Sequence, residues 1–218
     1  MTPKKIIIAD DHPLFRQALL QTLKVKLPSV AWVEAQSAEE LTAQLGVHSD
    51  AELLLLDLNI PQAHGFNLLI SIRNQWPKLP VVVVSAHEDE ETVVKAMSFG
   101  ASGFVPKSTP VDDIYLAIAA VLGGDTWLPE HIDLAQPCNS DILDKVASLT
   151  PQQHKILLMF ADGLLNKQIA YQLNLSEATV KAHATAIFRK LEVLNRTQAV
   201  IAISQLEVGS TPFSASSE

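Results

Sequence analysis

Three carboxylates, Asp10, Asp11 and Asp57, each follow a short apolar run, a position from which an acidic group can do chemistry. Asp10 and Asp11 come after the run IIIA at 6–9, and Asp57 comes after four consecutive leucines. Carboxylate oxygens are the ligands that Mg²⁺ prefers, and a cation relieves the repulsion among three of them. An aspartate can also act as a nucleophile toward phosphorus. The positions therefore predict a Mg²⁺ site with Asp57 as the candidate nucleophile.

Two further polar groups occupy equivalent positions. Ser85 closes the run VVVVS at 81–85, and Lys107 follows the run at 102–105. A hydroxyl and an ammonium beside a metal-bound carboxylate would bind an added phosphoryl group and neutralise its charge. Taken singly, each group has a simpler explanation, such as a solvated lysine, a turn serine or aspartates that cap a helix. Four strand ends that all supply the needed group favour a phosphoryl site.

Five strand-then-helix repeats between residues 4 and 122 would position these groups. Parallel strands joined by right-handed crossovers form an α/β sheet, here of the doubly wound, flavodoxin-like (βα)5 class. In the strand order 2-1-3-4-5 the first and third strands are neighbours, and ligands bind at their carboxyl ends. We therefore expect the carboxylates to converge on one edge of the sheet. The expected strands are 5–9, 30–35, 53–57, 81–85 and 102–105, and the expected helices are 13–27, 37–46, 65–75, 89–99 and 110–122.

The last third of the chain shows helical periodicity alone. The string TPQQ at 150–153 predicts a helix start, a second helix follows at 166–173, Ser176 caps a third, and a fourth begins near Asn195. The third helix has one apolar face, with Lys181, Thr185 and Arg189 turned away from it. Basic and small residues that face outward fit the major groove of DNA. The alternative is a plain helical hairpin with solvated lysines.

Length and composition agree with two modest domains. The chain has 218 residues, 48% of them hydrophobic and 18% charged, as in ordinary globular proteins. We expect a first domain at 1–122, a linker at 123–147, a second, smaller all-α domain at 148–208 and a disordered tail at 209–218. The formal net charge is −8, but residues 149–208 carry 6 Lys and Arg against 4 Asp and Glu. This asymmetry indicates different partners for the two parts.

A cytoplasmic location is the expectation from cysteine usage and hydropathy. Cys138 is the single cysteine, so an intrachain disulfide is excluded. The N-terminal residues reach Asp10 and Asp11 without a signal-peptide pattern. The longest uncharged apolar stretch, near 114–122, is shorter than the ~20 residues that a membrane span requires. We therefore expect no membrane partner.

The strings DDHPLFRQAL, LLLLDLNIPQAHG, VVVVSA and GASGFVPKS resemble the receiver domain of two-component response regulators of the NarL/FixJ type. The resemblance implies that Asp57 is the phosphoacceptor and that a sensor histidine kinase supplies the phosphate. It implies that Mg²⁺ is held by Asp10, Asp11, Asp57 and the backbone carbonyl of Asn59. It further implies that Ser85 and Lys107 contact the phosphoryl group and that Ser85 and Phe104 form the switch. Phe104 stands where tyrosine is frequent, which excludes a switch through an aromatic hydroxyl.

The string from Leu149 to Val200 closely resembles the LuxR-type helix-turn-helix domain. The resemblance implies that Lys181 and Ala182 face base edges and that the phosphate backbone is contacted by other residues of this domain. The full predicted DNA-binding set is Lys167, Thr179, Lys181, Ala182, Thr185, Arg189 and Lys190. The fourth helix is the expected dimer surface, through Ala199, Val200, Ile203 and Leu206.

Together the two resemblances imply a DNA-binding transcription regulator, not an enzyme. Phosphorylation of Asp57 would release or dimerise the helix-turn-helix domain, which then binds double-stranded promoter DNA as a homodimer, with RNA polymerase as a candidate further partner. An enzyme alternative is a phosphohydrolase with an aspartyl nucleophile. Such enzymes usually carry a second aspartate two residues on, where this chain has Asn59. Another alternative is a regulator that keeps the fold but responds to a different signal.

Overall fold

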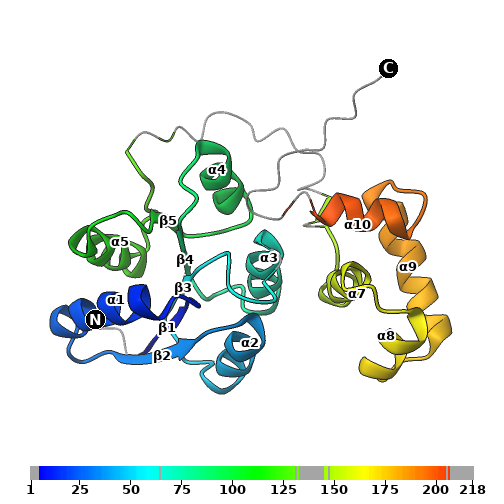
Figure 1. Ribbon diagram of the computed structural model, residues 1–218, viewed down its shortest axis with the longest axis horizontal. Coiled ribbons are helices and arrows are strands. Elements are labelled where there is room, and N and C mark those ends of the chain that lie inside the picture. The colour runs from blue at the N-terminus through cyan, green and yellow to red at the C-terminus, as the bar shows by residue number, and fades with distance from the viewer. Residues whose placement is uncertain are drawn as a thin grey trace. The chain divides into compact units, whose positions relative to one another are not determined.

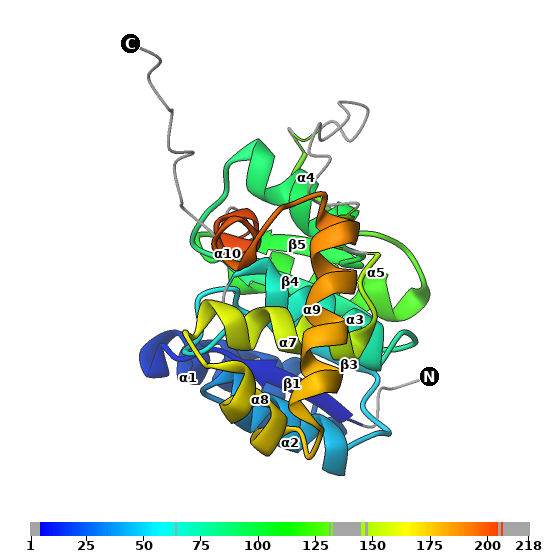
Figure 2. The same cartoon turned by 90° about the vertical axis from the view of Figure 1, so that its right-hand side faces the viewer.

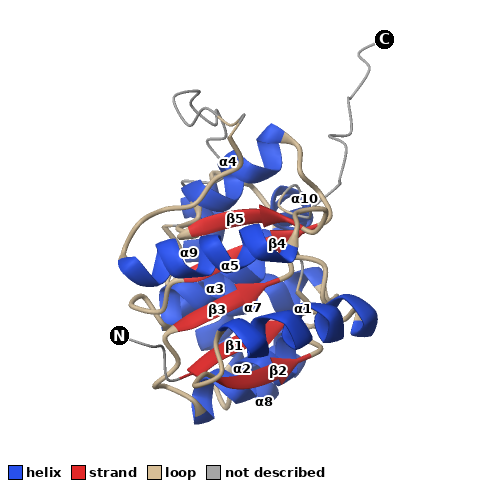
Figure 3. Cartoon of the chain, turned by 90° about the vertical axis from the view of Figure 1, so that its left-hand side faces the viewer, coloured by secondary structure: helices blue, strands red, loops and turns tan. Residues whose placement is uncertain are grey.

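Five parallel strands form one sheet in the order β2-β1-β3-β4-β5, as the sequence predicts (Figure 3). The computed structural model describes residues 5–63, 65–130, 132, 145–146, 148–204 and 206, and divides into two units, Met1–Cys138 and Asn139–Glu218. In the first unit strands alternate with helices: β1 Lys5–Ala9, α1 Pro13–Lys26, β2 Ala31–Ala35, α2 Ala38–Val47, β3 Leu53–Leu56, α3 Phe66–Gln75, β4 Val81–Ser85, α4 Glu90–Ser98, β5 Gly103–Pro106 and α5 Val111–Gly123.

The central strands are buried on both faces, which explains their unbroken apolar runs. Every residue of β3 and β4 is buried. Helices α1 and α5 cover one face of the sheet, and α2, α3 and α4 lie on the other (Figure 1). Strand β1 pairs with β3 in parallel, from Ile6 opposite Leu53 to Ala9 opposite Leu56. This register brings the carboxyl ends of the two strands to the same edge.

Residues just past α5 add to the edge of the sheet. Trp127 forms a parallel bridge to Gly103 of β5, and its carbonyl accepts a 2.9 Å hydrogen bond from the backbone N–H of Phe104. The segment around Trp127 therefore extends the sheet of the first unit, within the stretch 123–147 that the sequence assigns to a linker. Most of that predicted linker, and the predicted tail at 209–218, lie outside the described residues.

The second unit contains helices α7 Pro151–Ala161, α8 Asn166–Gln172, α9 Glu177–Leu191 and α10 Arg196–Ser204 (Figure 2). The predicted start of α7 is confirmed, because Thr150 and Gln153 form a reciprocal capping box. The hydroxyl of Ser176 caps α9 by accepting a hydrogen bond from the N–H of Thr179 at 3.0 Å. Between α8 and α9, Asn174 turns the chain with a φ of 53°, a conformation that asparagine tolerates well.

Within the described part of the chain, no helix combines the length and the apolarity needed to cross a membrane.

Candidate functional site

The structure brings the predicted carboxylates together at the carboxyl edge of the sheet. The N–H of Asp57 donates to the carbonyl of Ala9 at 2.8 Å, which places the end of β3 beside the end of β1. Asp10 and Asp57 are 2% and 1% exposed, whereas Asp11 is half-buried. Two backbone N–H groups orient the buried carboxylates: that of Asn59 donates to Asp57 Oδ1 at 3.0 Å, and that of His12 donates to Asp10 Oδ1 at 2.7 Å.

Lys107 reaches into this cluster from the end of β5. Its Nζ lies 2.7 Å from Asp10 Oδ2 and 2.7 Å from Asp57 Oδ2. Burial lowers the pKa of the Lys107 ammonium, but its hydrogen bonds to Asp10 and Asp57 outweigh that effect and raise the pKa above its usual value of 10.5. Lys107 is therefore a fixed positive charge beside Asp57 at neutral pH.

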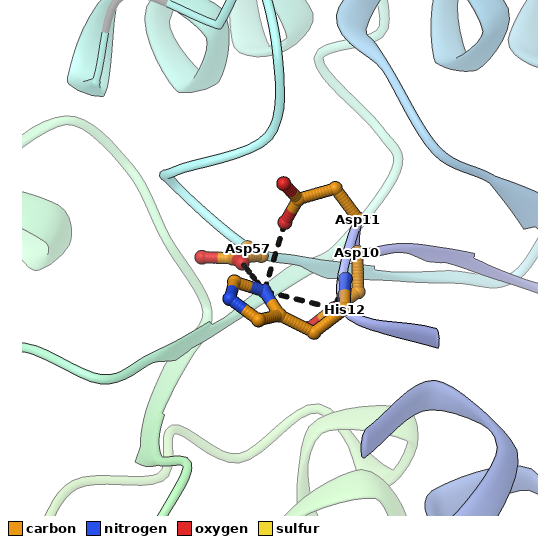
Figure 4. A group of neighbouring side chains, drawn as sticks. All are labelled: Asp10, Asp11, His12 and Asp57. Carbon is orange, nitrogen blue, oxygen red and sulfur yellow. Dashed lines mark hydrogen bonds and ion pairs between the residues drawn. The ribbon is translucent and has the colours of Figure 1, made fainter. Parts of the chain in front are cut away.

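His12 belongs to the cluster as well, which the sequence did not predict. Its Nδ1 lies 2.8 Å from Asp11 Oδ1, 3.6 Å from Asp10 Oδ1 and 3.8 Å from Asp57 Oδ2 (Figure 4). The imidazole is largely exposed, whereas the side chains of Asp10 and Asp57 beside it are buried (Figure 4). The one signal for it was its place in the sequence, directly after Asp10 and Asp11.

The cluster fits a divalent cation. The ligand atoms of Asp10, Asp11, His12 and Asp57 all lie within 4.8 Å of one another. The Oδ1 of Asp11 is buried, and the group beside it is the His12 imidazole at 2.8 Å, which is a cation only when protonated. Three carboxylates this close together repel one another unless a cation lies among them. Oxygen donors of this kind suit Mg²⁺, which usually keeps several of its waters.

The two predicted switch residues lie in the interior, and the predicted metal ligand Asn59 lies at the surface. Ser85 and Phe104 are both fully buried. The hydroxyl of Ser85 accepts a 3.1 Å hydrogen bond from the N–H of His87, so it is oriented by the loop that follows β4. Asn59 is exposed.

The outward face of α9 carries most of the predicted DNA contacts. Its inner face is buried through Val180, Ala184, Ile187 and Leu191. Ala182, Thr185 and Arg189 are exposed, and 64% of the Lys181 side chain is accessible. On α8, Lys167 is exposed too.

Lys190 and Thr179 differ from that pattern. The Nζ of Lys190 donates to the carbonyl of Ser148 at 2.6 Å, so it holds the chain that enters α7. The Thr179 hydroxyl lies 2.7 Å from that of Ser176 at the start of α9. Both side chains are half-buried and already have partners within the domain.

The predicted dimer surface needs correction. Ala199, Ile203 and Leu206 are 0%, 2% and 1% exposed, and Val200 is half-buried. Helix α10 packs against α7 and α9, so its apolar face is used inside the domain. The apolar residue that α10 does present to solvent is Ile201, which is 55% exposed.

Comparisons with known proteins agree with both units. Residues 6–119 match the response regulator receiver domain, and residues 147–203 match the domain of bacterial regulatory proteins of the luxR family. A glycerol metabolism activator of Pseudomonas putida is 39% identical over 212 residues, which cover 93% of this chain and 96% of that protein. The nitrate/nitrite response regulator protein NarL of Escherichia coli is 31% identical over 208 residues, with coverage of 93% and 96%.

Solved structures extend the likeness over both units. The response regulator RcsB of Salmonella typhimurium is 26% identical, with a TM-score of 0.55 and coverage of 94% of this chain and 100% of that one. An RcsB–DNA complex is 26% identical, with a TM-score of 0.56 and coverage of 94% and 99%. The chain belongs to the response regulators that join a receiver domain to a LuxR-type helix-turn-helix domain.

Proposed function

We propose that this protein is a transcription regulator that is switched by phosphorylation of Asp57. The observation that carries the proposal is the convergence of Asp57 with Asp10, Asp11 and Lys107 at one sheet edge, in a chain whose helix α9 exposes a basic face. Phosphate would come from a phosphohistidine of a sensor kinase. A carboxylate oxygen of Asp57 attacks phosphorus, the P–O bond forms, the P–N bond breaks, and the imidazole nitrogen keeps the electron pair.

The residues around Asp57 divide the work of this transfer. Mg²⁺ would be held by Asp10, Asp11, Asp57 and the carbonyl of Asn59, and it would neutralise charge on the phosphoryl oxygens. Lys107 now neutralises two carboxylates and would turn its ammonium toward the new phosphoryl group. Ser85 would then donate its hydroxyl to a phosphoryl oxygen.

The Ser85 hydroxyl now accepts a hydrogen bond from the N–H of His87, and Ser85 would move toward Asp57 to donate its own O–H to the phosphoryl group. That movement would change the packing around Phe104, on the neighbouring strand. The two residues thereby form the proposed switch.

The output would be binding of promoter DNA through α9. Lys181, Ala182, Thr185 and Arg189 have the exposure that the major groove requires, and Lys167, which is exposed too, would contact a phosphate. Lys190 and Thr179 would contact DNA beside their present partners, since the Lys190 ammonium has further N–H groups to donate and the Thr179 hydroxyl can still donate or accept. RcsB is described as bound to DNA as dimers. By analogy we propose a homodimer that uses the solvent face of α10, at Ile201, in place of the buried residues.

Phosphorylation would shift the population toward a form with a free, dimer-competent helix-turn-helix domain. Such a regulator would work in the bacterial cytoplasm, where its promoters lie and where RNA polymerase would meet it. The family assignment favours this role over a phosphohydrolase.

The decisive experiment compares wild type with Asp57→Ala on sheared genomic DNA, with and without acetyl phosphate and MgCl₂. We expect acetyl phosphate to raise the enrichment of a defined set of fragments by about tenfold in wild type, within the range of common allosteric couplings, and to have no effect on the variant. Equal enrichment in all four samples would contradict the proposed switch. Steady release of phosphate from small phosphate esters would instead support the hydrolase.

A further inference from the structure

Arg16 is a buried cation next to the acidic cluster, near a helix N-terminus, where the helix dipole disfavours positive charge. It lies in the first turn of α1 and is 6% exposed. The N-terminus of a helix has a partial positive charge, so a cation there is disfavoured, and burial of a guanidinium adds a desolvation cost. Specific partners must therefore hold Arg16 in place.

Those partners come from the ends of two strands. The Nη1 of Arg16 donates to the backbone carbonyl of Asp10, and its Nε donates to Glu34 Oε2 at 2.9 Å. Glu34 lies on β2, opposite Ile8 of β1. Arg16 thus links the first turn of α1 to the ends of β1 and β2, at the backbone of a residue of the cluster.

The carbonyl that Arg16 binds belongs to the peptide unit that joins Asp10 to Asp11. The N–H of Asp10 donates to the carbonyl of Ala35 at 3.1 Å, and its Oδ1 accepts from the N–H of His12 at 2.7 Å. Once Arg16 holds the carbonyl, the remaining polar atom of Asp10 is Oδ2, which faces Lys107 in the cluster. The same hydrogen bond fixes the orientation of the peptide plane that leads to Asp11, and with it the direction of the Asp11 side chain.

We propose that Arg16, anchored by Glu34, is a positioning residue for Mg²⁺, because it fixes the peptide that carries two of the metal's ligands. This inference rests on the proposed role of Asp10 and Asp11 as ligands. Without the guanidinium the peptide between Asp10 and Asp11 can rotate. Metal binding must then fix its orientation, which costs conformational entropy. Metal affinity then falls, whereas phosphoryl transfer at saturating metal changes little. The planar fork of arginine serves both acceptors at once, which a lysine ammonium on a flexible stem does less well.

The test uses the full chain with the substitutions Arg16→Gln and Arg16→Lys. Arg73→Gln is the matched control, because Arg73 also donates a hydrogen bond to a backbone carbonyl, that of Leu79, but outside the cluster. Calorimetric titration with MgCl₂ gives the dissociation constant, and phosphorylation by acetyl phosphate gives the half-saturating Mg²⁺ concentration and the maximal rate.

We expect Arg16→Gln to weaken Mg²⁺ binding about tenfold or more by both measurements, as is typical when a partner behind a metal ligand is lost. The maximal rate should stay within about threefold, and Arg16→Lys should recover part of the affinity. Arg73→Gln should leave Mg²⁺ affinity unchanged even if it lowers the melting temperature.

Unchanged Mg²⁺ affinity in folded Arg16→Gln overturns the inference, and so does an equal loss in Arg73→Gln, which would indicate a general effect of instability. If Arg16→Gln does not fold, Arg16→Lys and Glu34→Gln replace it under the same criteria. A wild-type protein that binds Mg²⁺ but is not phosphorylated at Asp57 contradicts the proposed function and leaves the role of Arg16 standing. A wild type that does not bind Mg²⁺ overturns both.

Discussion

Two lysines show how differently the two domains use the same charge. The side chain of Lys107 is 13% exposed and has carboxylates of Asp10 and Asp57 at 2.7 Å. The side chain of Lys181 is 64% exposed, and its nearest anion is Glu177 at 3.4 Å, one turn away on the same helix. The Lys107 ammonium is fixed in position by its two carboxylate partners, whereas the exposed Lys181 side chain can adjust its conformation to a binding partner.

This difference predicts different responses to mutation. Neither water nor another side chain can replace a buried group that stabilises a reacting atom. Removal of that one group should therefore cost most of the activity. Exposed groups that bind a polyanion contribute separately, and each can be lost at modest cost. The receiver should therefore react sharply to single changes, and the DNA-binding face should react gradually.

The largest effect is expected for Lys107→Met. The variant lacks the cation that would meet the charge on the phosphoryl group, and loss of one such contact commonly lowers a rate about 100-fold or more. The initial rate of Asp57 phosphorylation by acetyl phosphate at saturating MgCl₂ measures it. The control is Lys78→Met, which removes an exposed lysine from the same domain. Similar rates in the two variants would show that Lys107 behaves like a surface charge.

His154 tests whether a buried group in the DNA-binding domain is also sensitive to a single change, because it is a buried titratable group in that domain. It is 1% exposed, and burial lowers the pKa of its imidazole to about 4. Between pH 6.5 and 4 the unfolded chain binds a proton that the folded domain does not. The free energy of unfolding therefore falls as pH falls through this window, by about 2 kcal/mol between pH 7 and pH 5.

Hydrogen exchange of the α7 amides in denaturant, corrected for the intrinsic effect of pH, measures this change at pH 7 and pH 5. His154→Leu should remove most of the pH dependence whatever it does to stability at pH 7. If the variant keeps the slope of the wild type, another group titrates and His154 is not the cause.

The sequence predicted the receiver well because its signals are local. A central parallel strand is buried on both faces and reads as an apolar run, and the residue after the run must lie at the sheet edge, as Asp57 does. It did not reveal that the His12 ring turns back over the carboxylates, since ring direction depends on the loop geometry. The prediction of a dimer surface on α10 was wrong for a related reason. Ala199, Ile203 and Leu206 share one helical face, and periodicity alone does not distinguish a domain core from a dimer surface.

A smaller effect is expected for Lys181→Ala. If the exposed face of α9 binds DNA, loss of one cation should weaken binding by about 1–3 kcal/mol and reduce the salt dependence by about one counterion. Titration of an enriched genomic fragment at several NaCl concentrations measures both quantities. Lys155→Ala is the control, because Lys155 is also exposed but lies on α7. Equal losses in the two variants would mean that net charge, and not the face of α9, determines binding.

The smallest effect is expected for Gly103, at the edge of the receiver sheet beside Trp127. A methyl group on Gly103 would lie 3.2 Å from both Cβ and the carbonyl oxygen of Trp127 and 3.3 Å from Cγ2 of Val121. Because that oxygen accepts the hydrogen bond of the Phe104 N–H, Gly103→Ala should push the strand-like segment away and cost about 1 kcal/mol of stability. The control Gly123→Ala has no atom within 4 Å of the new methyl and should be neutral or stabilising, by up to about 1 kcal/mol, since it lies at the end of α5.

Urea unfolding of both variants, followed by tryptophan fluorescence, measures the difference, and amide exchange at Phe104 should accelerate in Gly103→Ala alone. All three tryptophans precede the second unit, so the signal reports on the receiver. A Gly103→Ala protein as stable as Gly123→Ala would mean that Trp127 yields without cost. The edge of the sheet would then be as tolerant as the exposed face of α9, and sensitivity to single changes would belong to the acidic cluster and not to the receiver as a whole.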